Sequence, residues 1–135
     1  MRRLFADTSY FIALLYPKDE FHRRAVSITD GLEAPLITTQ WVMAELGNFM
    51  CIKGQRTQFL ECLKMVQSGD DNLLLEADDQ SFWAGVGLYE SRSDKEWSLV
   101  DCISFAVMDR FGLRDALSAD HHFQQAGYHA LLLNN

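Results

Sequence analysis

The chain has 135 residues, 48% of them hydrophobic, and its 12 basic and 19 acidic residues give a formal net charge of −7. This length accommodates one domain, residues 1–135, and the composition is that of an ordinary soluble globular protein. Tight, non-specific nucleic-acid binding is excluded by the acidic balance, because proteins that bind nucleic acid in this way carry a positive surface.

Two further features predict a protein of the cytoplasm without a membrane anchor. No apolar run reaches the roughly 18 residues that a membrane-spanning helix needs. The apolar run at the N-terminus is interrupted at Asp7, which is too early for a signal peptide. The three cysteines, Cys51, Cys62 and Cys102, are odd in number and form no C-x-x-C pair. We therefore expect three reduced thiols at core positions.

The first half of the chain alternates short apolar runs with segments of helical period. Residues 4–6 form the first predicted strand. A helix with apolar residues at helical spacing between positions 21 and 32 follows, and Asp19 is its expected N-cap. The second predicted strand, 35–38, leads to Thr39, which is expected to cap a helix that runs to about residue 51.

The pattern continues in the second half. Gly54 precedes a predicted helix with apolar residues from 59 to 66, and residues 72–75 form the third predicted strand. A helix opens at Asp78 or Asp79 and runs to about Tyr89. Residues 98–111 form a nearly all-apolar helix that Gly112 ends. The last two predicted strands are 116–118 and 129–132, with a short helix between them.

Strands without polar alternation, separated by helices, indicate a parallel sheet that is buried on both faces. Right-handed crossovers then give a three-layer α/β/α sandwich, for which we expect the strand order 3-2-1-4-5. Ligands bind such sheets beyond the carboxyl ends of the strands, where the strand order reverses. In this order the first and fourth strands are neighbours at that point.

Two aspartates follow these two strands. Asp7 comes after the first strand and Asp120 after the fourth, so both are expected in one crevice. The alternative is helix capping, because aspartate is a preferred N-cap and a helix follows each of them. The two roles are compatible.

Glu45 has apolar neighbours at helical spacing, Trp41, Val42 and Phe49. This pattern predicts a glutamate in the middle of an apolar helix face, where it costs several kcal/mol unless it is paired or bound to a cation. No basic residue lies at helical spacing from it on that face. The alternatives are a side chain that extends to the rim and a distant arginine partner.

Asp101 lies in the pattern Ser98-x-x-Asp101, a capping box at the start of an apolar helix. That helix leads into the fourth strand, so its first turn belongs at the sheet edge that carries Asp7 and Asp120. A capping aspartate there still faces the crevice.

Four carboxylates at one edge repel each other without a cation. Mg²⁺ or Mn²⁺ is the natural partner, because both ions prefer oxygen ligands and keep several waters. Such a site lowers the pKa of water and neutralises charge on a phosphate. Thr8, Ser9 and Ser98 are expected to hold a water or a phosphate oxygen.

Other candidates for chemistry are weaker. His121 and His122 are adjacent, diverge by about 100° on a helix and are not expected to share a metal; one of them can touch substrate near Asp120, but surface positions are the simpler interpretation. Four methionines are interpreted as core residues. They are Met43, Met50, Met65 and Met108.

In order and over nearly the whole length, four segments resemble the PIN domain, in particular the VapC-type toxins of bacterial toxin–antitoxin pairs. The segments are Asp7-Thr8-Ser9-Tyr10-Phe11-Ile12-Ala13-Leu14, Ala44-Glu45-Leu46, the run from Trp97 to Met108, and the run from Ala116 to Phe123. The resemblance implies a PIN-like fold and an endoribonuclease that uses one or two Mg²⁺ or Mn²⁺ ions. It assigns the acidic site to Asp7, Glu45, Asp101 and Asp120, with Ser98 or Thr8 as the supporting hydroxyl.

The resemblance also implies partners. Family members are usually homodimers held by a small antitoxin, whose tail covers the acidic pocket, and they cleave RNA. In a dimer, basic groups from both copies would together hold the RNA; candidates are Lys53, Arg56, Arg92 and Lys95. Two alternatives stay open: a PIN-type nuclease of RNA processing without an antitoxin, and a catalytically silent interaction module that keeps the acids as caps.

Overall fold

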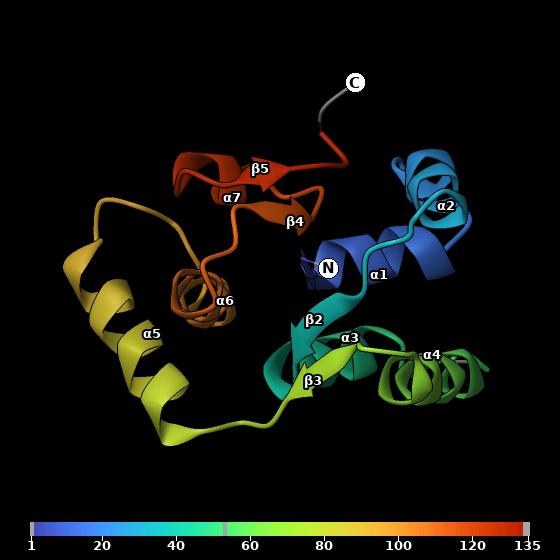
Figure 1. The fold of residues 1–135 in the computed structure, drawn as a ribbon, viewed down its shortest axis with the longest axis horizontal. Helices are drawn as coiled ribbons and strands as arrows, with labels where there is room; N and C mark the ends of the chain where they lie inside the picture. Colours follow the sequence, from blue (N-terminus) through green and yellow to red (C-terminus); the bar gives the residue numbers. More distant parts are fainter. Residues whose placement is uncertain (1, 53, 134–135) are drawn as a thin grey trace.

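The computed structural model describes residues 2–52 and 54–133. It contains a five-stranded, all-parallel sheet in the order β3-β2-β1-β4-β5 (Figure 1). This order and the direction of the strands confirm the predicted sheet. The strands are β1 (Leu4–Ala6), β2 (Leu36–Thr39), β3 (Leu73–Leu75), β4 (Asp115–Leu117) and β5 (His129–Ala130).

Helices cover both faces of the sheet, which confirms the three-layer arrangement. In Figure 1, α5 and α6 lie on one side of the strands, and α1, α2 and α4 lie on the other. The helices are α1 (Thr8–Leu15), α2 (His22–Asp30), α3 (Gln40–Phe49), α4 (Arg56–Ser68), α5 (Asp79–Ser91), α6 (Leu99–Arg110) and α7 (His121–Gln125). Within the described residues no helix combines the length and the apolar character needed to cross a membrane.

The centre of the sheet sets the geometry of the site. Phe5 and Ala6 of β1 are completely buried, and they pair in register with Ala116 and Leu117 of β4. The backbone N–H of Asp7 then donates to the carbonyl of Leu117 at 3.0 Å. The strand ends of β1 and β4 are therefore side by side where the strand order reverses.

Helix starts follow the predicted capping chemistry at several places. The Thr39 hydroxyl accepts from the N–H of Val42, and the Asp78 side chain accepts from the N–H of Ser81. Asp19 differs from the prediction: α2 begins three residues later, at His22, and the Asp19 carboxylate accepts from the N–H of Phe21 in the preceding turn.

The backbones of α5 and α6 approach closely at Gly85. A Cβ atom at this position would lie 2.4 Å from Cγ1 of Ile103 and 2.8 Å from its Cα. Contacts of that length do not occur between real atoms, so only glycine permits this approach of the two helices. Asp101 lies two residues before Ile103 on α6, and its place depends on this packing.

Two core predictions and one strand boundary need correction. Cys62 and Cys102 are buried as expected, but Cys51 is exposed, because it follows the end of α3 where the chain leaves the core. Met43, Met50 and Met108 are buried, whereas Met65 is 57% exposed on the outer face of α4. The last strand ends at Ala130 and not at residue 132, since the chain turns at residues 131–133.

Candidate active site

A cavity of about 390 Å³ opens at the carboxyl ends of β1 and β4. All four carboxylates that the sequence singled out contribute to its wall, together with the three predicted hydroxyl residues. The lining comprises Asp7, Thr8, Ser9, Ile12, Glu45, Phe49, Glu96, Ser98, Asp101, Asp120 and His122. We call this cavity the acidic pocket. Segments from the two ends of the chain meet in it because β1 and β4 are neighbours.

Asp7 is a buried carboxylate held by two serines. It occupies the N-cap position of α1, but its side chain accepts no capping hydrogen bond from a backbone N–H of that helix. Its Oδ2 accepts from Ser9 Oγ at 2.8 Å and from Ser118 Oγ at 3.0 Å. Only 4% of Asp7 is exposed. The interpretation of Asp7 as a cap is therefore wrong for its side chain.

Burial raises the pKa of the Asp7 carboxyl to about 7, and the neighbouring carboxylates of Asp101 and Asp120 raise the pKa as well. The hydrogen bonds from Ser9 and Ser118 act in the opposite direction, because they favour the charged form. A buried carboxylate with a pKa this high is costly to ionise unless a cation is bound beside it.

Asp101 combines the capping role with a place in the pocket. The capping box with Ser98 forms in full: Ser98 Oγ accepts from the N–H of Asp101, and Asp101 Oδ2 accepts from the N–H of Ser98 at 3.2 Å. The same Oδ2 is 3.1 Å from Nδ1 of His122. Burial raises the pKa of the Asp101 carboxyl, and the charge of Asp120 adds to this rise.

Asp120 is the N-cap of α7, as the capping interpretation predicted. Its Oδ1 accepts from the N–H of His122 at 2.9 Å. Its own N–H donates to Ser118 Oγ, the hydroxyl that also bonds Asp7. Ser118 therefore connects the two aspartates that follow β1 and β4, and capping and pocket lining coexist at Asp120.

Glu45 lies at the mouth of the acidic pocket and is exposed, not buried. The prediction that it lies within a buried apolar face is wrong, and the alternative of a side chain at the rim is the observed one. The reason is that its neighbour Phe49 is itself 45% exposed. These two side chains of α3 border a cavity and do not pack into the core.

The pocket fits a hydrated divalent cation. Thr8 Oγ1 is buried and lines the pocket, yet it has no hydrogen-bond partner among the described residues. A buried hydroxyl without a partner is unusual and is normally satisfied by a water or an ion's water shell. The oxygen atoms of Asp7, Asp101 and Asp120 are of the kind that Mg²⁺ and Mn²⁺ prefer.

His121 and His122 converge, contrary to the prediction that they diverge. Their ring centroids are 4.4 Å apart. Both Nδ1 atoms lie near Asp120 Oδ1, at 3.7 Å for His121 and 3.4 Å for His122. The angle of about 100° separates Cβ directions in a continuing helix, but these residues open α7, and their side chains fold back towards the capping carboxylate.

Two residues that line the acidic pocket and one buried residue behind it, Ser118, were not predicted as site residues. Ser118 had a recognisable position, directly between a strand end and Asp120. His122 touches Asp101 across 21 residues of chain, a contact that no local pattern reports. Glu96 is an exposed acid just before the helix of Asp101, and nothing in its spacing distinguishes it from other surface acids.

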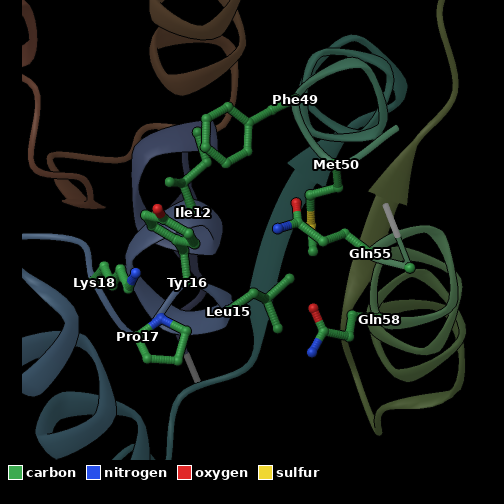
Figure 2. Close-up of a pocket in the computed structure, with 10 residues that line it drawn as sticks. Ile12, Leu15, Tyr16, Pro17, Lys18, Phe49, Met50, Gln55 and Gln58 are labelled. Atoms are coloured by element: carbon green, nitrogen blue, oxygen red, sulfur yellow. The ribbon is translucent and has the colours of Figure 1, made fainter. Parts of the chain in front are cut away.

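A second cavity of about 350 Å³ adjoins the acidic pocket and shares Ile12 and Phe49 with it. Figure 2 shows Tyr16 and Phe49 on one side of this cavity and the amide side chains of Gln55 and Gln58 on the other. The rings of Tyr16 and Phe49 are edge to face with centroids 6.2 Å apart. We call it the aromatic cavity.

The predicted basic groups are partly engaged elsewhere. Arg92 pairs with Asp94 at 3.0 Å and lies over the Trp97 ring at 5.1 Å. Arg56 donates to the carbonyl of Cys51. Lys53 lies outside the described residues.

Comparison with known proteins gives a fold assignment. No protein-family model and no curated protein sequence matches the chain. Solved structures with a similar fold include two toxin structures. VapC20 of Mycobacterium tuberculosis, described as a sarcin–ricin loop-cleaving toxin, is 20% identical with a TM-score of 0.85 over 94% of this chain and 97% of that one. FitAcB from Neisseria gonorrhoeae is 16% identical with a TM-score of 0.66 over 92% of each chain.

The fold and the acidic pocket thus define an α/β/α domain with a carboxylate site at the strand ends. More narrowly, the chain has the fold of VapC20 and FitAcB, which agrees with the PIN-like fold that the resemblance of its sequence segments implies.

Proposed function

We propose that the chain is a metal-dependent endoribonuclease, the toxin of a toxin–antitoxin pair. The observation that carries this proposal is the acidic pocket, in which Asp7, Asp101 and Asp120 approach from three different elements and Glu45 borders the mouth. Hydrolysis of a phosphodiester at such a cluster is the reaction that carboxylates of this number and placement support. The similarity in fold to the toxin VapC20 points to RNA as the substrate.

Asp7, Asp101, Asp120 and Glu45 are the proposed ligands of Mg²⁺ or Mn²⁺. When bound, the ion would lower the pKa of a water molecule that it coordinates and would neutralise charge on the phosphate. The chain's own groups hold the ligands in place: Ser9 and Ser118 orient the Asp7 carboxylate, and Ser98 orients that of Asp101. Thr8 Oγ1, buried and without a partner among the described residues, is available to a water of the site.

The aromatic cavity is the proposed path of the RNA strand beside the scissile phosphate. It is continuous with the acidic pocket through Ile12 and Phe49. Exposed aromatic rings stack on unpaired bases and contribute about 1–3 kcal/mol per base. Lys18, in the wall of this cavity, supplies a positive charge for the backbone.

The proposed partners are a small antitoxin and a second copy of the chain, both acting in the cytoplasm. A basic antitoxin segment complements the charge of the acidic pocket. Two helices on opposite sides of the sheet each offer exposed apolar side chains for a contact between copies: Leu60 and Met65 on α4, or Trp83 and Tyr89 on α5, all more than half exposed. Light scattering that finds only monomer, with no partner co-purified from the native host, contradicts this part.

The central test is cleavage of a synthetic RNA hairpin with the sarcin–ricin loop sequence, beside total RNA, in Mg²⁺, in Mn²⁺ and in EDTA. We expect cleavage with either ion and none in EDTA. Cleavage at an undiminished rate in EDTA contradicts metal dependence. Folded protein that neither gains stability from Mg²⁺ nor cleaves either RNA supports the silent module instead.

The two ends of β4 provide a matched pair of variants. Asp120→Asn changes the acid that follows the strand, and Asp115→Asn changes the acid that begins it, outside the acidic pocket. We expect cleavage to be lost in the first and kept in the second. Equal rates in both variants remove Asp120 from the site.

A further inference from the structure

The start of α7 holds a cluster of a different chemical kind from the carboxylates of the acidic pocket. One ligand atom each from Asp120, His121 and His122 lies within 4.8 Å of the other two. Both nitrogen donors are imidazoles, and His121 is 67% exposed at its side chain. Besides its approach to Asp120, His121 has no polar contact among the described residues that explains this orientation.

The spacing of these atoms suits one cation. Bonds of about 2.1 Å in a tetrahedral complex place neighbouring ligand atoms about 3.4 Å apart. The distances from Asp120 Oδ1 to the Nδ1 atoms are 3.4 Å for His122 and 3.7 Å for His121. The two imidazole nitrogens lie within 4.8 Å of each other, and rotation of the exposed His121 ring can bring them closer. Asp120 is already fixed, because its Oδ1 accepts from the N–H of His122.

The ligand types select the class of ion. Imidazole nitrogen is a good ligand for Co²⁺, Ni²⁺ and Zn²⁺, whereas Mg²⁺ takes oxygen ligands. A site with two imidazoles and one carboxylate therefore discriminates against Mg²⁺, unlike the oxygen-rich centre of the acidic pocket.

We propose that the chain binds one transition-metal ion of the Co²⁺, Ni²⁺ and Zn²⁺ class through Asp120, His121 and His122. Its ligand set differs from that of the proposed magnesium site, and the two sets have Asp120 in common. The sites adjoin, because His122 also lines the acidic pocket and its Nδ1 lies 3.1 Å from Asp101 Oδ2. The proposal does not require that the chain cleaves RNA. It follows from the ligand set that these three side chains form.

The test is equilibrium dialysis of the purified full chain against Co²⁺, with the visible absorption of bound Co²⁺ as a second readout. We expect one Co²⁺ per chain, retained in a molar excess of Mg²⁺. Changes in groups that only orient metal ligands cost 10- to 100-fold in affinity. Removal of a ligand in His121→Ala should therefore weaken binding at least tenfold. The exposed ring contributes little to packing, so the variant should melt like the wild type in EDTA.

Two control variants address other donors on the surface. His129 also faces an acid, with Nδ1 at 2.7 Å from Asp115, but as an isolated pair. His129→Ala should keep Co²⁺ binding. Cys51 is an exposed thiol, and Cys51→Ser should keep binding too. Equal affinity of His121→Ala and wild type, or loss of binding in either control, overturns the proposal.

Asp7→Asn separates this proposal from the proposed function. The variant is expected to lose RNA cleavage and to bind Co²⁺ like the wild type, because Asp7 is not among the three ligands. A wild-type chain that cleaves RNA but binds Co²⁺ no more tightly than Mg²⁺ refutes the transition-metal site alone. A chain that binds Co²⁺ and never cleaves RNA refutes the nuclease alone.

Discussion

Substitution of Asp7 by asparagine should stabilise the metal-free protein at neutral and alkaline pH. The asparagine side chain keeps an oxygen that can accept the hydrogen bonds from Ser9 and Ser118, but the substitution removes a charge that is costly to bury. The folded protein holds the Asp7 proton up to a pKa of about 7, whereas the unfolded chain releases it near 3.8.

The sign of the pH effect follows from proton linkage. Between pH 4 and 7 the folded state binds more protons at Asp7 than the unfolded state does, so the free energy of unfolding falls as the pH rises. A pKa difference from 3.8 to about 7 corresponds to about 4 kcal/mol. The wild type in EDTA should lose up to this amount between pH 4 and 8.

Urea unfolding in EDTA at pH 5 and pH 8 measures this difference. At pH 8 Asp7→Asn should exceed the wild type by several kcal/mol, equivalent to a melting temperature higher by on the order of 10 °C. At pH 5 the two should differ much less. Addition of Mg²⁺ should stabilise the wild type strongly and the variant weakly. A ligand raises the free energy of unfolding only to the extent that it binds the folded protein, and the variant lacks one proposed ligand.

An exposed acid provides the control. Asp70 lies at the surface beyond α4, and Asp70→Asn should reproduce the wild-type pH dependence. A wild type whose stability in EDTA is flat from pH 5 to 8, or an Asp7→Asn variant that falls in parallel with it, would refute the assignment of Asp7 as a costly buried carboxylate.

Three other substitutions test the remaining walls of the two cavities. Asp101→Asn keeps an oxygen for the capping box, so the variant should melt within a few degrees of the wild type. Its cleavage rate should fall at least about a hundredfold, because a few kcal/mol of metal-derived stabilisation is lost. Near-normal cleavage would leave Asp101 as a helix cap only. Glu45→Gln should abolish cleavage with an unchanged melting temperature in EDTA, because Glu45 is exposed; a large loss of stability indicates a structural pairing. Phe49→Ala should raise KM for RNA about tenfold or more with little change in kcat, consistent with the loss of one stacked base, and an unchanged KM moves the RNA path elsewhere.

The sheet could be predicted because β1 to β4 are short, mainly apolar runs, each ended or followed within three residues by a polar residue at a helix start. Asp7 and Asp120 were found by the same logic, since Asp7 directly follows β1 and Asp120 comes three residues after β4. Once the strand order is correct, adjacency of the strand ends brings both into one pocket. Their proximity therefore needed no knowledge of side-chain packing.

The exposure of Glu45 could not be predicted in this way. Apolar neighbours at helical spacing indicate a helix face that is at least partly buried. They do not distinguish a face that packs in the core from one that borders an open cavity. The convergence of His121 and His122 was missed for a related reason. The expected angle between neighbouring side chains applies to the middle of a helix, whereas in the first turn the side chains orient towards the capping residue, here Asp120. The contact of His122 with Asp101 depends on how α7 packs against α6, which only the folded chain specifies.

The close approach of α5 to α6 makes the carboxylate site sensitive to a residue that carries no functional group. Because Gly85 leaves no room for even a methyl group against Ile103, any larger side chain there pushes α6 away from α5 and moves Asp101, two residues along, relative to Asp7 and Asp120. A substitution of Gly85 would leave all four carboxylates in the sequence unchanged and would still alter their relative positions. The four carboxylates are thus not sufficient for a working site. The spacing between α5 and α6 must be kept as well.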